Sequence, residues 1–190
     1  MQLNSSSTQD KERHLNALVA VTVVILSVFM GIAKIKDDNI VQTMQLAKSD
    51  AVDSWSQYQA KKIKYHLTES SLQQANLLIK SGIVKAEVFR EEQDRLAAEL
   101  KRYESDSNEL QSQAKAFEAK YDALNFHDDQ FDMSDATLAI ALAMAAVAAL
   151  TSNWSLLLLS WCFGSVGVLF GLAGFLSWPL HPDWLATFLS

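Results

Sequence analysis

The sequence predicts an all-α membrane protein with three transmembrane helices and a long antiparallel coiled-coil hairpin between the first and the second. Residues 89–124 place an apolar or aromatic side chain at nine of eleven positions spaced alternately by four and three. Residues 15–33 and 136–182 contain no charged side chain. Between Ile32 and Phe163 the chain has one glycine, Gly82, and no proline, so its helices can run long.

The eleven spaced positions form a seam on one helix face. They are Phe89, Gln93, Leu96, Leu100, Tyr103, Ser107, Leu110, Ala114, Phe117, Tyr121 and Leu124. A seam sustained over five heptads is typical of a coiled coil. An apolar stripe needs a partner helix to cover it. We therefore expect Leu100, Leu110 and Phe117 to lie at a helix–helix interface.

Charge is distributed very unevenly along the 190 residues, whose formal net charge is −6. All 16 Lys and Arg residues lie between Lys11 and Lys120. The mean hydropathy is close to zero because it averages a polar part and an apolar part. The lone Cys162 lies in an apolar run, where we expect buried packing rather than a redox role.

Residues 1–14 read as a polar N-terminal arm, disordered or frayed, and residues 15–36 as transmembrane helix 1. Its uncharged core of 19 residues would be about 28 Å long, close to the hydrocarbon thickness of about 30 Å. A cleaved signal peptide is the alternative, but its apolar region usually has only about 7–15 residues. The sequence therefore favours a retained anchor.

Residues 37–132 are expected to form the coiled-coil hairpin, with a turn near 81–85. The arms 37–80 and 85–126 have 44 and 42 residues, or about 63–66 Å each as helix. Gly82 suits the left-handed residue that ends a helix. The first arm has a weaker seam, formed by Val41, Met44, Ala51, Trp55, Tyr58, Tyr65, Leu72 and Ile79. Two helices in a compact globular bundle are the alternative, which the equal arm lengths disfavour.

Residues 133–178 are expected to form a transmembrane hairpin with a turn near 151–154, after a helix break at 127–132. The 47 uncharged residues from 136 to 182 would span about 70 Å as helix, which is right for two crossings. Trp154, Trp178 and Trp184 fall where aromatic rings prefer the membrane interface. Residues 179–190 are the expected C-terminal interfacial tail.

Small residues recur in this hairpin at intervals of four. They are Ala141, Ala145 and Ala149 in its first helix, and Gly167 and Gly171 in its second. Small-xxx-small faces allow close helix approach in lipid. Two interpretations stay open: a face that contacts a second chain, or packing within the chain itself.

No motif predicts chemistry. Five residues are expected to meet at the membrane surface: Asp37, Asp38, His127, Asp128 and Asp129. A cation is conceivable there, because Asp oxygens are hard ligands. Their spacing matches no metal motif, however, and favours a solvated acidic collar. A basic cluster at residues 61–64 lies in a stretch, 37–135, with net charge −7, which argues against nucleic acid. We expect no enzyme activity, cofactor or metal.

A short segment of the first arm resembles a family signature. Asp53-Ser54-Trp55-Ser56-Gln57-Tyr58-Gln59-Ala60-Lys61 is similar to the Trp-x-x-Tyr-Gln-Ala-Lys signature of an uncharacterised bacterial family, the domain of unknown function 4337. The resemblance implies the same architecture end to end and a bacterial source, and no activity. Trp55 and Tyr58 are expected to anchor the hairpin. Members often carry basic residues in the second turn, where this chain has Ser152 and Asn153.

These patterns together predict a non-enzymatic, multi-pass protein of a bacterial inner membrane. Its expected role is an oligomeric scaffold or accessory subunit, with the lipid bilayer and a homo-oligomer or other membrane-complex subunits as partners. A transport or channel module whose pore forms on oligomerisation is the alternative. The basic residues flanking helix 1 favour a cytoplasmic hairpin, whereas the family's basic turn implies a hairpin on the non-cytoplasmic side, which we prefer.

Overall fold

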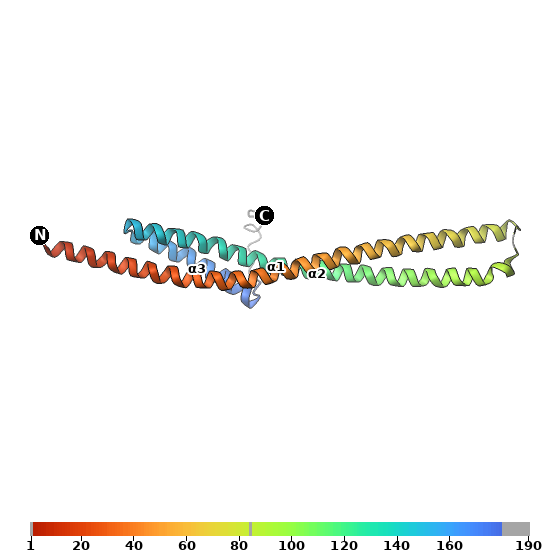
Figure 1. The fold of residues 1–190 in the computed structure, drawn as a ribbon, viewed down its shortest axis with the longest axis horizontal. Coiled ribbons are helices and arrows are strands. Elements are labelled where there is room, and N and C mark those ends of the chain that lie inside the picture. Colours follow the sequence, from red (N-terminus) through yellow and green to blue (C-terminus); the bar gives the residue numbers. More distant parts are fainter. Residues whose placement is uncertain (1, 84, 180–190) are drawn as a thin grey trace. The chain divides into compact units, whose positions relative to one another are not determined.

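The computed structural model describes residues 2–83 and 85–179, with the side chains of 10–83, 85 and 87–179. These residues form three helices and no strand: α1 (Gln2–Lys80), α2 (Ala86–Thr151) and α3 (Trp154–Leu176) (Figure 1). The all-α prediction is confirmed. The expected disorder of residues 1–14 is wrong from Gln2 onward, because that segment has no glycine or proline and continues the helix that follows.

The chain divides into two units, each described here by itself. The hairpin unit is Met44–Asp122, and the three-helix unit comprises the described parts of Met1–Thr43 and Ala123–Ser190. Both α1 and α2 contribute to each unit.

The hairpin unit is made of two antiparallel helical segments joined by a tight turn (Figure 1). Helix α1 ends at Lys80, and Gly82 has a φ of 74°. Two hydrogen bonds close the helix end: the N–H of Gly82 donates to the Ile79 carbonyl at 3.1 Å, and that of Ile83 to the Leu78 carbonyl at 3.2 Å. This is a Schellman ending, which favours glycine at the left-handed position. The break predicted at Gly82 is present.

Burial in the hairpin unit follows the predicted seam. Every seam position from Phe89 to Tyr121 is buried or half-buried. Leu96, Ser107 and Ala114 are the most enclosed, and the first arm supplies buried alanines such as Ala47. The first arm is therefore the partner that the seam requires.

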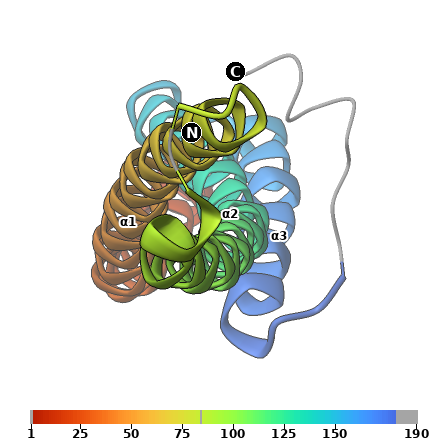
Figure 2. The ribbon, with the colours of Figure 1, turned by 90° about the vertical axis from the view of Figure 1, so that its right-hand side faces the viewer.

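In the three-helix unit, α1, α2 and α3 lie side by side (Figure 2). Its core contains one cluster of Leu15, Val19, Ala145, Ala148 and Leu157, and a second of Leu26, Leu138 and Ala141. Phe175 lies edge-on to Phe29 and Phe131, with ring centroids 6.4 Å and 5.2 Å apart. All three helices thus contribute to the core of this unit.

The turn between α2 and α3 is held by Asn153. Its side-chain oxygen accepts a hydrogen bond from the N–H of Ser155 at 2.9 Å, which caps the start of α3. Ser152 takes the left-handed conformation with a φ of 50°. Asn153 is therefore the N-cap of α3, and Ser152 makes the turn before it.

Two expectations fail in the three-helix unit. Residues 127–132 do not break the helix, because α2 runs unbroken from Ala86 to Thr151. Aspartate disfavours helix only weakly. In addition, the buried Gln130 connects this stretch to the residues just after α3, because its side-chain N–H donates a hydrogen bond to the Trp178 carbonyl at 2.8 Å. Cys162 is exposed rather than buried, because it lies outside the contact of α3 with the other helices.

Each of the three helices contains a stretch long and apolar enough to cross a membrane, judged by length and composition. The expected interfacial tail, with Trp184, lies outside the described residues from position 180 onward.

Candidate functional site

The signature segment lies on the first arm of the hairpin unit. The indole N–H of Trp55 donates to Glu118 Oε1 at 2.8 Å, and its ring lies edge-on to Tyr58 with centroids 5.4 Å apart. Lys61 Nζ lies 2.5 Å from Asp106 Oδ2. Trp55 and Lys61 therefore bind α2 directly, and Tyr58 supports the indole.

The remaining hairpin residues singled out from the sequence lie in the seam. Leu100, Leu110 and Phe117 are half-buried, in keeping with a helix–helix contact within the chain. Gln59 and Ala60 of the signature segment are exposed on the opposite side of α1.

That opposite side of α1 carries a second stripe, which we call the outer stripe. Its eleven positions alternate by three and four and are all exposed: Leu46, Ser49, Asp53, Ser56, Ala60, Ile63, Leu67, Ser70, Gln74, Leu77 and Ser81. It has a single charged residue, Asp53. The equivalent exposed positions of α2 include Glu91, Arg95, Arg102 and Glu109. The two arms thus present chemically different surfaces to their surroundings.

The glycines of α3 pack against the chain's own helices. A Cβ at Gly167 would lie 2.7 Å from Leu138 Cγ, and one at Gly171 would lie 2.6 Å from Phe29 Cε1. The chain's own side chains occupy the space beside both glycines, which supports packing within the chain, one of the two alternatives left open by the sequence. We therefore propose no contact with another chain at Gly167 or Gly171.

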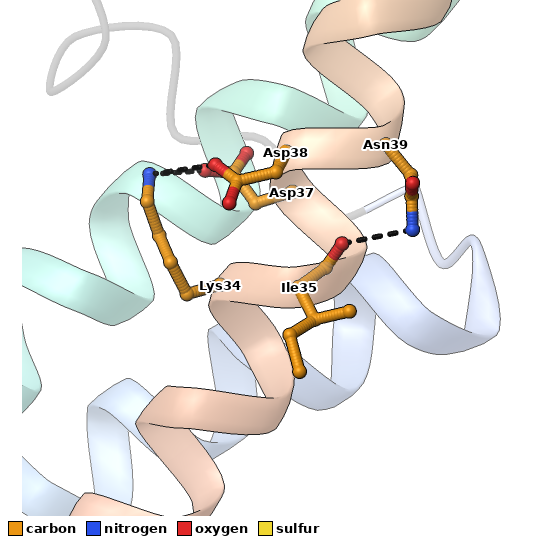
Figure 3. A network of polar contacts seen from close by, with 5 residues as sticks. All are labelled: Lys34, Ile35, Asp37, Asp38 and Asn39. Atoms are coloured by element: carbon orange, nitrogen blue, oxygen red, sulfur yellow. Dashed lines mark hydrogen bonds and ion pairs between the residues drawn. The ribbon is translucent and has the colours of Figure 1, made fainter.

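An acidic cluster lies in the three-helix unit, centred on a buried aspartate. Asp37 is only 4% exposed, and Lys34 Nζ contacts its Oδ2 at 2.8 Å. Figure 3 shows Lys34 reaching the carboxylates of Asp37 and Asp38 one turn further along α1; the Asp38 contact is longer, at 3.6 Å. The second oxygen of Asp37, Oδ1, is buried and has no hydrogen-bond partner among the described residues.

Helix α2 brings two more carboxylates to Asp37. Burial raises the pKa of Asp128 to about 7, and hydrogen bonding to and repulsion by Asp37 add to the effect. The pKa of Asp132 is also raised, first by burial and then by the charge of Asp37, while Lys34 opposes the shift. Asp128 and Asp132 are four residues apart, so both lie on one face of α2.

The expected acidic collar is therefore not uniformly solvated. His127 and Gln130 are in hydrogen-bonding contact at 3.2 Å, and Asp38 stays exposed. Among the described residues, no group of three or more His, Cys, Asp or Glu side chains is placed to hold a metal ion.

The burial of Asp37 is the feature that the sequence analysis missed. Asp37 lies seven residues before Met44, a buried position of the first arm's seam. Extending the heptad pattern by one repeat toward the N-terminus would have placed this carboxylate on the packed face of α1.

Comparison with protein families finds a match over most of the chain. A family model described as Domain of unknown function (DUF4337) matches residues 15–177. No curated protein and no solved structure matches the chain.

Proposed function

Because the chain belongs to the family described as Domain of unknown function (DUF4337), whose description assigns no activity, we propose a function from the chain's own surfaces. We propose an oligomeric scaffold or accessory subunit of a membrane complex, without enzyme activity. The outer stripe of the hairpin unit is the observation that carries this proposal.

The outer stripe carries five apolar side chains among polar and mostly uncharged ones, and exposing the large apolar ones to water has a physical cost. Ile63, Leu67 and Leu77 are each more than 60% exposed, and burying such a side chain is worth about 1.5–3 kcal/mol. Spacing by three and four fits the packing of another helix along the stripe. The equivalent exposed positions of α2 include charged side chains, which favour contact with water.

The partner that we favour is a second copy of the same chain. A second copy in the same membrane has its hairpin in the same orientation, so its outer stripe is of equal length and in register. Most oligomers of soluble proteins are closed assemblies of identical subunits, and in a dimer each subunit contributes the same surface to the contact. The outer stripes of two copies would meet in this way.

The membrane setting is part of the proposal. The three apolar stretches support a multi-pass protein, and the resemblance to a bacterial family supports a bacterial inner membrane. We place the hairpin on the non-cytoplasmic side. A cysteine introduced at Ser81, in a Cys162→Ala background, should react with an impermeant thiol reagent in intact cells; protection would reverse the orientation.

Crosslinking in native membranes tests the oligomer. In the Cys162→Ala background, Ser56→Cys or Ser70→Cys on the outer stripe should give disulfide-linked dimers on mild oxidation. Ser105→Cys, exposed on the outer face of α2, is the matched control and should stay monomeric. Equal dimer yield from Ser70→Cys and Ser105→Cys would refute the outer stripe as the contact.

A substitution on the stripe gives the second arm of the test. Leu67→Asp should abolish the Ser70→Cys crosslink because the new charge would be buried between two chains. Ala98→Asp, on the exposed face of α2, should leave it intact. Ion flux through vesicles reconstituted with the wild type, lost with Leu67→Asp, would instead favour the transport alternative.

A further inference from the structure

Asp37 Oδ1 is buried, and a buried carboxylate oxygen needs a hydrogen-bond donor. Lys34 satisfies Oδ2, and Oδ1 is left enclosed without a partner among the described residues. An unsatisfied buried acceptor is costly, and more so when it belongs to a charged group. Some donor must therefore complete this site.

The groups around Oδ1 offer few donors. On α1, Lys34 is engaged and Asp38 is a further acid; on α2, Asp128 and Asp132 interact with Asp37, while the charge of Asp129 acts in turn on both of them and that of Asp135 on Asp132. Residues 171–179 of α3 and its end carry no charged side chain. The excess of carboxylates over the single lysine makes a protonated carboxyl the natural donor.

We propose that Asp37 and Asp128 share one proton, which holds α1 and α2 together in the three-helix unit. We call this shared-proton contact the clasp. The O–H of Asp128 donates to Asp37 Oδ1 while the proton is bound. Its loss places two carboxylates together in a poorly solvated site, and the two helices separate locally to admit water. The inference rests on the three-helix unit and is independent of the outer stripe.

The protonation behaviour of Asp128 supports this arrangement. Its pKa is raised from 3.8 to about 7, so the folded protein holds a proton that the unfolded chain releases. The folded state then binds more protons than the unfolded state between about pH 4 and pH 7, and its stability falls as the pH rises through that range. The clasp itself opens as the pH passes about 7.

Carbon-13 NMR of aspartate carboxyl groups measures the shared proton directly. Full-length protein in nanodiscs is titrated from pH 4 to pH 9, and the Asp128 signal is assigned by its absence from Asp128→Asn. We expect a midpoint near pH 7. A midpoint above pH 6 supports the proposal, and a lower one overturns it.

Two variants separate the shared proton from simple burial. Asp37→Asn removes the neighbouring charge and should lower the Asp128 midpoint by about one pH unit or more. Asp38→Asn, an exposed aspartate beside it, is the matched control and should leave the midpoint unchanged. Equal midpoints in the two variants would overturn the pairing of Asp37 with Asp128.

Hydrogen–deuterium exchange tests the opening of the clasp. After correction for the intrinsic rate, peptides covering residues 126–133 should exchange faster at pH 8 than at pH 6 in the wild type. In Asp128→Asn the amide donates to Asp37 at either pH, so the difference should vanish. A difference that persists in Asp128→Asn would overturn the proposal.

Discussion

Replacing Gly171 by alanine adds one methyl group where α3 meets the other helices of the three-helix unit. The new Cβ would lie 2.6 Å from Phe29 Cε1 and 2.9 Å from Ser134 Oγ. Carbon atoms pack best at about 3.5–4.0 Å, so the ring must move by about 1 Å. Phe29 also lies edge-on to Phe175, which limits that movement.

The expected cost follows from this overlap. Overpacking of a filled core costs about 1–3 kcal/mol, and the better helix propensity of alanine returns up to about 1 kcal/mol. Gly31→Ala is the matched control in α1, because nothing lies within 4 Å of the added Cβ. It should be neutral or stabilising by up to about 1 kcal/mol. The difference between the variants isolates the packing cost.

Thermal unfolding in mild detergent measures this difference. For a chain of this size, 1 kcal/mol corresponds to about 2–4 °C in Tm, so Gly171→Ala should melt at least about 2 °C below Gly31→Ala. Gly171→Leu should melt lower still. Equal melting temperatures for Gly171→Ala and Gly31→Ala would show that Phe29 and Ser134 do not enclose this glycine, and the assigned contact of α3 would be wrong.

Three further outcomes are expected from the same assay. Leu110→Asp should cost about 2–4 kcal/mol because it places a charge in the seam, whereas Ser112→Asp on the exposed face should be close to neutral; similar values would refute the seam. Asn153→Ala removes the cap of α3 and should cost about 1 kcal/mol, with Asn153→Ser retaining most of the stability. Asp106→Asn breaks the contact with Lys61 and should cost up to about 1 kcal/mol at low salt; a loss that 1 M salt leaves unchanged would argue against an ion pair.

The sequence by itself determined the long helices and their pairing. Heptad spacing from Phe89 to Tyr121 names the residues that the hairpin buries, because periodicity fixes which side chains share a helix face. Gly82 marks the turn because α1 is followed there by a left-handed backbone conformation, which glycine adopts without strain. The apolar stretches fix the number of candidate membrane spans by composition alone.

The tertiary structure decided which surfaces those helices use. Small residues at Gly167 and Gly171 permit close approach to any helix, and only the position of Phe29 and Leu138 shows that the chain fills these positions itself. Residues 127–132 look like a helix break, yet contacts with the end of α3 keep α2 continuous. Heptad spacing places Asp37 on the packed face of α1, but only the tertiary structure shows that α2 brings Asp128 and Asp132 to it and leaves Oδ1 of its carboxylate buried without a partner among the described residues.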